Sequence, residues 1–300
     1  MKKERQRNYK ERNEHPSPVG VIGGSGLYGM KGLTEAREVA VKTPFGKPSS
    51  PIILGKLGGV DCAFLARHGK GHVLLPGEIN GRANIWALKS LGVRRIIGVA
   101  AVGSLREELV PRHFVFPDQI VDETKGRRST FFGDGCVAHT AFAHPFCPEL
   151  RKLLFKTSES LGITSHWGGV YACMEGPQFS TRAESEYHRA QGYSLIGMTV
   201  VPEAKLAREA ELCYATVALV TDYDCWKDGE EVTNQVVIAN LTANVENAQR
   251  LIAATASAAA GPTACACGDA LAGSIFTNPA AIPPKTRKAL DLIVGKYLKK

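Results

Sequence analysis

Short apolar runs alternate with longer stretches of helical periodicity along most of the chain. The β-branched run from Val19 to Ile22 predicts a buried first strand, and residues 51–67 predict two strands that meet at Gly58-Gly59. We expect further strands at Arg95 to Ala101, Val170 to Met174, Ser194 to Thr199 and Tyr214 to Thr221. Helices are predicted at Asn84 to Leu91, residues 180–190, residues 203–212 and Asn240 to Ala260. This alternation is typical of an α/β sheet flanked by helices.

The periodic pattern begins after a basic arm. Residues 1–12 hold six Lys/Arg against two Glu and lack apolar periodicity, so residues 1–17 are predicted to be a flexible N-terminal arm. The chain has 300 residues, 44% of them hydrophobic, which is enough to bury one large core. We therefore expect residues 18–300 to form a single domain that includes a C-terminal helical segment.

Charge and composition exclude several classes of function. The formal charge is +8, but much of the excess lies in the arm, and the rest of the chain mixes both signs instead of forming a basic stripe with aromatics. We expect neither nucleic acid nor membrane as a partner, because no apolar run reaches eighteen residues. The polar start after Met1 is unlike a signal peptide, which predicts a cytoplasmic protein. The eight cysteines lack paired metal-ligand spacings, so buried reduced thiols are expected and no metal is predicted.

Small and polar residues follow six of the predicted strands. In open α/β sheets, ligands bind beyond the carboxyl ends of the strands, so these clusters are expected to converge on one pocket. The six clusters are Gly23-Gly24-Ser25-Gly26, Arg67-His68-Gly69, Ala100-Ala101-Val102-Gly103, Glu175-Gly176-Pro177, Met198-Thr199 and Asp222-Tyr223-Asp224.

The glycine loop after the first strand fits a dinucleotide fingerprint at Gly24, Gly26 and Gly29. That fingerprint requires a long helix opening at the loop and an acidic residue about 20 positions further on. Neither is present, because the region expected to hold the acid reads Thr43-Pro44-Phe45-Gly46-Lys47-Pro48. A nicotinamide-dependent dehydrogenase is therefore a distant alternative. The loop can instead hold an anion through its N–H groups and the Ser25 hydroxyl.

A second anion-binding feature is Arg67-His68 at a predicted strand end. A guanidinium beside a second donor suits several phosphate oxygens at once. In isolation such a pair is equally well a solvated strand edge. Together with the glycine loop, Thr199 and the Ala100-Ala101 backbone, it indicates one wall of a phosphate site.

Seven motifs in order resemble the trimeric purine nucleoside phosphorylase family, and most closely its methylthioadenosine phosphorylase branch. The similarity runs from about Val19 to Leu251. The motifs are Gly23-Gly24-Ser25-Gly26-Leu27, Thr43-Pro44-Phe45-Gly46-Lys47-Pro48, Ala66-Arg67-His68-Gly69, Asn84-Ile85-Trp86-Ala87-Leu88, Gly103-Ser104-Leu105-Arg106-Glu107-Glu108, Glu175-Gly176-Pro177-Gln178-Phe179 and Thr221-Asp222-Tyr223-Asp224-Cys225-Trp226.

This resemblance implies a nucleoside phosphorylase fold, a mixed central sheet flanked by helices. It also implies a homotrimer or a dimer of trimers, with phosphate as cosubstrate and neither metal nor organic cofactor. Met198 would lie against the ribose and Phe179 on the purine, while His139 resembles a histidine lent by a neighbouring subunit. The implied phosphate ligands are Ser25, Arg67, His68, Thr199 and the N–H of Ala101.

Cleavage of an N-glycosidic bond develops negative charge on the departing purine, which an acid must stabilise. We assign N7 protonation to Asp222, whose pKa would have to be raised by burial or by Asp224 two residues on. A carboxylate also accepts hydrogen bonds from the 6-amino group of adenine, whereas a 6-oxo purine suits an amide. Asp224 could alternatively cap the loop or pair with Lys227.

The activity implied is that of a pentosyltransferase of purine and methionine salvage, which cleaves S-methyl-5'-thioadenosine with phosphate. Methylthioinosine or other purine nucleosides are the near alternative substrates, and a non-catalytic nucleotide-binding module is a further one. The 5'-methylthio group needs an apolar pocket, which Val232, Val236 and Val237 could line at the start of the following helix. Residues at this spacing are also typical of core.

Two positions depart from the family, and one motif lies near the C-terminus. Ala100 stands where a hydroxyl or amide is common, which predicts weaker phosphate binding, and His144 replaces a usual acid with no effect that we can derive. Cys265-Ala266-Cys267 resembles a motif of archaeal members of the branch. Free thiols, a strained disulfide and a metal pair are three readings of it, the last disfavoured because no partner pair is near in sequence.

Overall fold

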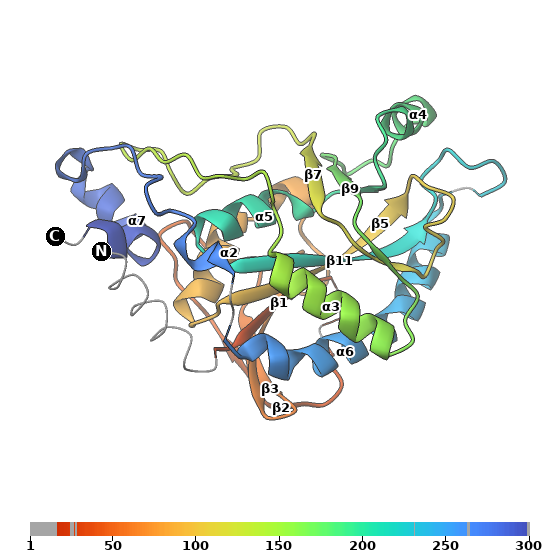
Figure 1. The fold of residues 1–300 in the computed structure, drawn as a ribbon, viewed down its shortest axis with the longest axis horizontal. Helices are drawn as coiled ribbons and strands as arrows, with labels where there is room; N and C mark the ends of the chain where they lie inside the picture. The colour runs from red at the N-terminus through yellow and green to blue at the C-terminus, as the bar shows by residue number, and fades with distance from the viewer. Residues whose placement is uncertain (1–16, 25–26, 28, 231, 263–264, 299–300) are drawn as a thin grey trace.

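A computed structural model describes residues 17–24, 27, 29–230, 232–262 and 265–298. One mixed sheet runs through them, with its strands in the order β2-β3-β4-β1-β5-β10-β9-β7 (Figure 1). Strand β11 pairs with β5 and β6, and β6 pairs with β8. The strands are β1 Val19–Gly23, β2 Leu33–Val39, β3 Ile52–Leu57, β4 Val60–Ala66, β5 Arg95–Ser104, β6 Phe114–Phe116, β7 Gln119–Asp122, β8 Ser165–Trp167, β9 Val170–Cys173, β10 Leu195–Gly197 and β11 Cys213–Asp222.

The helices confirm the predicted α/β alternation. They are α2 Gly81–Ser90, α3 Pro148–Ser160, α4 Arg182–Ala190, α5 Val200–Glu209, α6 Asn234–Ala260 and α7 Pro284–Leu298, with short 3₁₀ turns η2 Pro76–Glu78, η3 Ala266–Asp269 and η4 Pro279–Ala281. Sequence analysis missed β2, β6, β7, β8 and α3. Strands β6 and β8 have three residues each, too few for a period, and the interior of β2 is exposed on both faces.

The sheet carries a hydrophobic core on each face. Helices α3 and α6 pack on one face, and α2, α5 and α7 on the other (Figure 1). Side chains alternate between these cores, as a strand requires: Val19 and Val21 join the α3/α6 core, and Ile22 joins the other. Every residue of β11 is buried, because helices cover both sides of this central strand.

A break in the pairing of β5 creates room for a ligand. Strand β1 pairs with β5 as far as Gly98, and β10 pairs with it from Gly103. Strand β11 pairs with the other edge of β5 as far as Gly103. On the first edge, the residues of β5 between Gly98 and Gly103 therefore pair with no described strand. Ala101 lies in this stretch and is the one exposed residue of β5. The sheet therefore opens here onto a cavity.

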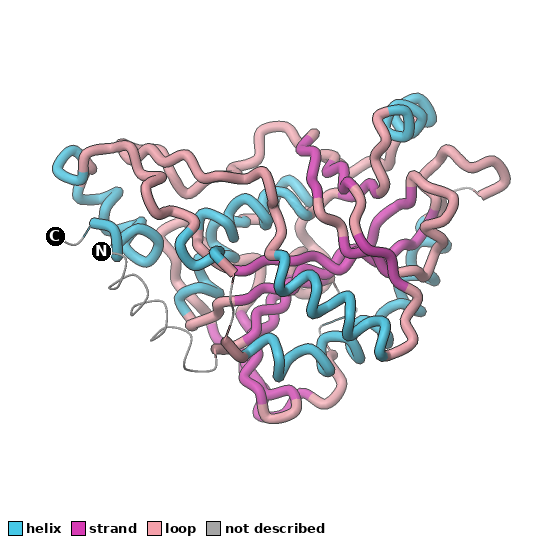
Figure 2. Tube along the Cα trace, in the orientation of Figure 1, coloured by secondary structure: helices cyan, strands magenta, loops and turns pink. Residues whose placement is uncertain are grey.

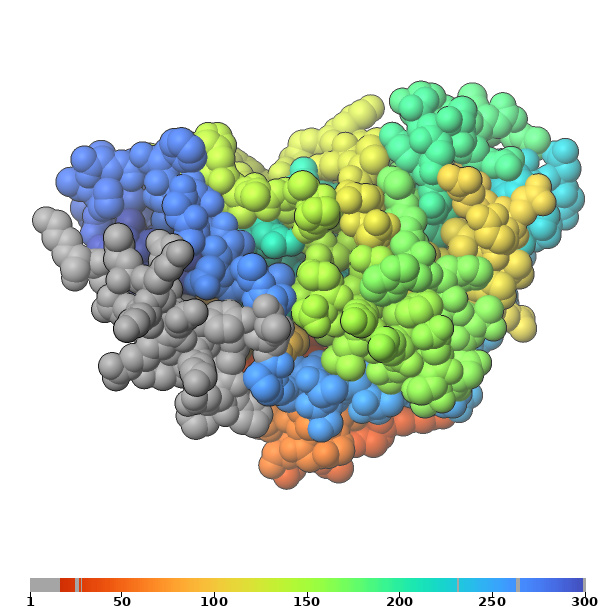
Figure 3. Space-filling model, in the orientation of Figure 1, coloured from red at the N-terminus to blue at the C-terminus, as the bar shows by residue number. Residues whose placement is uncertain are grey.

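Several connections lie outside this sheet. Residues 123–147 contain no helix or strand and run as one long loop (Figure 2). The space-filling view places the C-terminal segment at one end of the molecule and the α4 region at the other (Figure 3). Between β1 and η2 the described residues include no α-helix, so the context that a dinucleotide fingerprint needs is missing there. No helix among the described residues is long and apolar enough to cross a membrane.

Candidate active site

A cavity of about 410 Å³ lies beyond the carboxyl ends of the parallel strands β1, β4, β5 and β11. Each of the six loop clusters expected to converge contributes to its lining, so that geometric prediction is confirmed. The predicted site residues that line it are Arg67, His68, Ala101, Phe179, Met198, Thr199, Asp222, Asp224 and Val237. Their individual roles remain predictions.

Two predicted residues are not part of this lining. Ser25 lies outside the described residues, although its neighbour Gly24 lines the cavity. His139 is exposed and elsewhere, with its N–H donating to Ser274 O at 2.9 Å and its ring 5.1 Å from that of Phe276. A role for His139 in the cavity therefore requires a second subunit, as the family resemblance implies.

Arg67 is buried and already engaged within the protein. Its Nε and Nη2 donate to the carboxylate of Glu203 at 2.5 and 3.1 Å, while Nη1 donates to Val99 O and Nη2 to Ile22 O. Burial lowers the pKa of Arg67, but the Glu203 charge more than offsets this, so the net shift is upward. Four of its five N–H groups thus have partners among the described residues, and one on Nη1 is left for a ligand.

His68 is held as a neutral imidazole. Its Nδ1 lies 2.9 Å from Leu74 O, and a carbonyl only accepts, so Nδ1 carries the proton. Burial lowers the pKa of His68 to about 4, with the Arg67 charge adding to the effect and the Leu74 carbonyl opposing it. At neutral pH, Nε2 is therefore a hydrogen-bond acceptor, suited to a protonated phosphate oxygen rather than a bare one.

Asp222 ends β11 at the wall of the cavity. Its Oδ2 accepts from the Thr221 hydroxyl at 2.7 Å and its Oδ1 accepts from the Asp224 N–H at 2.8 Å. Burial raises the pKa of Asp222 above its usual range, and the nearby Asp224 charge adds to this against the opposing hydrogen bonds. The shift has the direction that a proton donor at neutral pH needs.

Asp224 supplies the one buried carboxylate oxygen without a hydrogen-bond partner among the cavity residues that the structure describes. Its side chain is buried, and its Oδ2 has no hydrogen-bond partner. The residue adopts a left-handed conformation with φ of 51°, which a short polar side chain tolerates better than most. A buried acceptor without a partner is costly unless a ligand satisfies it. Asp224 neither pairs with Lys227, whose partner is Glu230, nor caps the loop through that oxygen.

A β-bulge directs Asp222 toward the cavity. The register of β11 against β5 shifts between Val220 and Asp222, so that Asp222 stands opposite Gly103. A Cβ on Gly103 would lie 2.8 Å from Asp222 Oδ1 and 2.9 Å from a methyl of Ile196. Glycine at this position is therefore required for the close approach of the carboxylate.

One face of α6 forms an apolar wall. Val237, Leu241, Val245 and Ala248 line the cavity at helical spacing. Val237 was predicted for this wall, but its neighbour Val236 is 40% exposed and Val232 is also outside the lining. The helical period explains the exposure of Val236, because successive helix residues point about 100° apart, whereas Val232 precedes the first residue of α6.

Arg127 is a site-forming residue that sequence analysis missed. Its Nε faces both Glu175 oxygens at 3.1 Å, Nη1 donates to Met198 O and Val201 O, and Nη2 donates to Met174 O and Glu175 O. The Arg127 guanidinium thus joins the segment of Met174 and Glu175 to the segment of Met198 and Val201, and both methionines line the cavity. Its only sequence signal is a basic residue within a long loop, and nothing local reveals partners that lie 47 or more positions away.

The two departures from the family pattern lie in different surroundings. Ala100 lines the cavity, where a methyl group offers phosphate no hydrogen bond. His144 lies outside the lining, and its backbone carbonyl accepts from Arg208. The structure offers no account of the substitution at His144.

The fold is a mixed α/β sheet, and its cavity at the strand ends is lined by apolar side chains, by Arg67 of a buried ion pair and by two aspartates, which is the architecture of a small-molecule enzyme site. The family model of the phosphorylase superfamily matches residues 18–257, and the chain belongs to this family.

Curated relatives agree over nearly the whole chain. S-methyl-5'-thioadenosine phosphorylase of Koribacter versatilis is 54% identical over 280 residues, covering 93% of this chain and 96% of the relative. The protein of the same name from Geobacter sulfurreducens is 52% identical over 282 residues, covering 93% and 99%.

Solved structures share the fold. A methylthioadenosine phosphorylase from an antarctic soil metagenomic library superimposes with a TM-score of 0.88 at 48% identity, covering 93% of this chain and 99% of that one. The methylthioadenosine phosphorylase of Schistosoma mansoni in complex with adenine gives a TM-score of 0.78 at 39% identity, covering 81% and 91%. The fold is thus that of the nucleoside phosphorylases, as the sequence predicts.

Proposed function

We propose that this chain catalyses phosphate-dependent cleavage of S-methyl-5'-thioadenosine to adenine and 5-methylthioribose 1-phosphate. The names of its relatives support this substrate. The structural observation that carries the proposal is the pair of buried acids at one cavity wall. Asp222 has a raised pKa, and Asp224 presents an oxygen without a partner.

The two acids divide the recognition of adenine between them. Protonated Asp222 donates to N7 as the glycosidic bond lengthens, which makes adenine a better leaving group. Its own two oxygens are held by Thr221 and by the Asp224 backbone, so it is oriented before the substrate arrives. The unpartnered Oδ2 of Asp224 accepts a hydrogen bond from the 6-amino group, which a 6-oxo purine cannot supply.

Phosphate binds near the ends of β1 and β4, where Gly24 and Arg67 line the cavity. The remaining N–H of Arg67, the Thr199 hydroxyl and the Ala101 backbone N–H donate to it, and Ser25 is expected to do so as well. Neutral His68 accepts from the protonated oxygen of hydrogen phosphate through Nε2. Because Glu203 already balances the charge of Arg67, this site binds phosphate by hydrogen bonds more than by net charge. No organic cofactor is needed for this reaction.

The remaining lining fits the sugar and its substituent. Met198 contacts the ribose and Phe179 the purine face in this proposal, which is supported by their places in the cavity lining and by the 47% exposure of Phe179. The apolar face of α6 around Val237 holds the 5'-methylthio group and leaves a 5'-hydroxyl without a partner.

The oligomer completes the site in this proposal. A cytoplasmic homotrimer, or a dimer of trimers, brings His139 of one subunit to the 5' end of the substrate in the next. The exposed His139 and Phe276 pair is consistent with such a contact. The enzyme then serves purine and methionine salvage.

A phosphate-dependent assay tests the proposal. Methylthioadenosine, methylthioinosine, adenosine and inosine are compared with and without phosphate, and release of the free base is followed. We expect methylthioadenosine to give the highest kcat/KM and turnover to vanish without phosphate. Faster turnover of both 6-oxo substrates would contradict the proposed preference for adenine nucleosides. Cleavage without phosphate would contradict the proposal that the reaction is a phosphorolysis.

A further inference from the structure

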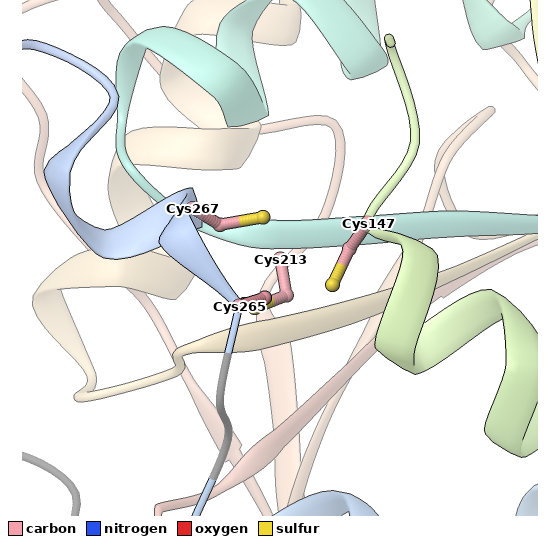
Figure 4. A group of neighbouring side chains, drawn as sticks. All are labelled: Cys147, Cys213, Cys265 and Cys267. Carbon is pink, nitrogen blue, oxygen red and sulfur yellow. Dashed lines mark hydrogen bonds between the residues drawn. The ribbon is translucent and has the colours of Figure 1, made fainter.

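Four cysteines from three distant segments meet on the α3/α6 side of the sheet. Cys147 precedes the first residue of α3, Cys213 begins β11, and Cys265 and Cys267 lie at the start of η3. All four are buried, and their sulfur atoms all lie within 4.8 Å of one another (Figure 4). The closest pair, Cys213 and Cys265, is separated by 3.2 Å.

The fold supplies what the sequence lacks. Cys265 and Cys267 have no partner pair nearby in the chain, which disfavours a metal site when only spacing is considered. Tertiary packing brings Cys147 and Cys213 to the same point from positions that are 66 residues apart (213 − 147). None of the four lines the cavity described above, so this cluster is separate from the nucleoside site.

We infer that Cys147, Cys213, Cys265 and Cys267 bind one zinc ion as a tetrahedral four-thiolate site. A zinc–sulfur distance of about 2.3 Å places tetrahedral sulfur atoms about 3.8 Å apart. The observed range, with 3.2 Å for the closest pair and 4.8 Å as the upper limit, brackets this value. Small side-chain rotations therefore suffice to complete the site.

The arrangement of the sulfur atoms distinguishes a metal from disulfides. Two disulfides would require the sulfur atoms to be close only within each bonded pair, at about 2.05 Å. They would not require the two pairs to lie close to each other. Here all four sulfur atoms converge on one centre. A shared centre is the geometry of tetrahedral coordination.

One buried cation on the same face offsets part of the charge of the proposed site. Binding Zn²⁺ releases four thiol protons to solvent, so the occupied site carries two net negative charges. Arg95 is the register partner of Cys213 on β5, and its guanidinium donates to Ala259 O in the same α3/α6 core. Arg95 is buried and forms no ion pair with a carboxylate among the described residues. It supplies a cation on the side of the sheet where the thiolates lie.

The bound ion would connect the C-terminal segment to the sheet. Residues 265–267 follow the end of α6, and Cys213 starts the strand that ends at Asp222. Zinc would therefore hold the segment leading to α7 against the strand that carries the proposed acid. Its role is structural, because it lies outside the cavity, and its loss would be felt as reduced stability.

Metal analysis of the full-length chain tests the inference. The protein is purified with a reductant, without chelators and after removal of any histidine tag, and zinc is measured by plasma mass spectrometry. We expect about one zinc per chain. Replacement by Co²⁺ should give sulfur-to-cobalt charge-transfer bands and the intense visible bands of tetrahedral coordination.

Single substitutions locate the ion. Cys147→Ser and Cys267→Ser are each expected to lose most of the bound zinc, whereas Cys62→Ser, which alters an equally buried thiol on β4, should keep it. Zinc content unchanged in both cluster variants would overturn the assignment, even if zinc is present.

Thiol counting covers the case in which a variant fails to fold. Wild-type protein incubated with Zn²⁺ and then freed of unbound metal is denatured without reductant, and its thiols are titrated. Zinc-free protein overturns the inference, whether eight free thiols or two disulfides are found. Stoichiometric zinc with eight titratable thiols, after chelation in the denaturant, supports it.

Discussion

The backbone N–H of Asp224 donates to Oδ1 of Asp222 at 2.8 Å, and the same residue keeps its own Oδ2 without a partner. The left-handed turn at Asp224, with φ of 51°, makes both features possible within two residues. One carboxyl is thus oriented by the protein, and the other keeps a buried oxygen without a protein partner. This division is the physical basis of the proposed adenine preference.

Asp222→Asn should strongly reduce cleavage of methylthioadenosine. The amide fits the same space but cannot give up a proton to N7, so kcat/KM is expected to fall about 10²–10⁴-fold. The relative rate on 6-oxo nucleosides should rise, because an amide has two N–H donors and can donate to the 6-oxo oxygen beside N7 as well as to N7 itself. Steady-state assays on the four nucleosides measure both effects. Asp228→Asn, on an exposed neighbouring aspartate, is the control and should change little. If Asp222→Asn leaves the ratio of kcat/KM for 6-amino and 6-oxo nucleosides unaltered, Asp222 does not contribute to recognition of the purine base.

Gly103→Ala should impair catalysis through displacement of Asp222. The new methyl group would lie 2.8 Å from Oδ1 of that residue. We expect a loss of about 10²-fold in kcat and about 1–3 kcal/mol in the free energy of unfolding. Gly29→Ala is the matched control, since a Cβ there meets no atom within 4 Å. Full activity in Gly103→Ala would mean that the position of the Asp222 carboxylate is not critical.

Arg127→Met should raise KM and lower stability. The variant removes the guanidinium that joins the Met174 and Met198 segments and leaves Glu175 without its charged partner. Loss of one member of such a pair costs about 3–5 kcal/mol when the pair is buried, and less here because Glu175 is 30% exposed. Urea denaturation and nucleoside titration measure the two effects. Adding Glu175→Gln should restore part of the stability, because the uncompensated charge is removed, without restoring KM. If the double variant also regains the wild-type KM, Arg127 does not position these loops.

Val237→Ala should weaken selection for the methylthio group. Removing part of the apolar wall lowers kcat/KM for methylthioadenosine relative to adenosine by about tenfold. The adjacent Val236 is 40% exposed and outside the cavity lining, so Val236→Ala is a matched control with no expected change. Equal effects of the two substitutions would place the 5' pocket elsewhere.

His68 predicts a specific pH dependence of stability. Its folded pKa of about 4 lies below the value of 6.5 for an unperturbed histidine, so the unfolded chain binds the extra proton between these values. The contribution of His68 to the free energy of unfolding is therefore fully present above pH 6.5 and is lost as the pH falls toward 4. The loss is at most about 3 kcal/mol.

The measurement is the free energy of urea unfolding at several pH values. His68→Asn retains a donor for Leu74 O but does not titrate, so its stability should fall less steeply between pH 6.5 and 4. Identical slopes for the two proteins would show that His68 is not the group responsible.

Much of the fold and the location of the site follow from local patterns. Long apolar or alternating runs predict strands from local sequence alone. Examples are the run Val19 to Ile22, the strand from Arg95 and the strand ending at Thr221. The clusters that follow them converge because parallel strands end on one edge of the sheet. Short strands such as β6 and β8 could not be predicted, since three residues define no period.

By itself, the sequence determined which residues surround the cavity, including Arg67, His68, Asp222 and Asp224. Only the tertiary structure decided how each is engaged. Arg67 meets Glu203 across 136 positions, and four cysteines from three segments share one centre. Neither contact has a local signature, because the pairing energy depends on burial and distance in the folded chain and not on spacing along it.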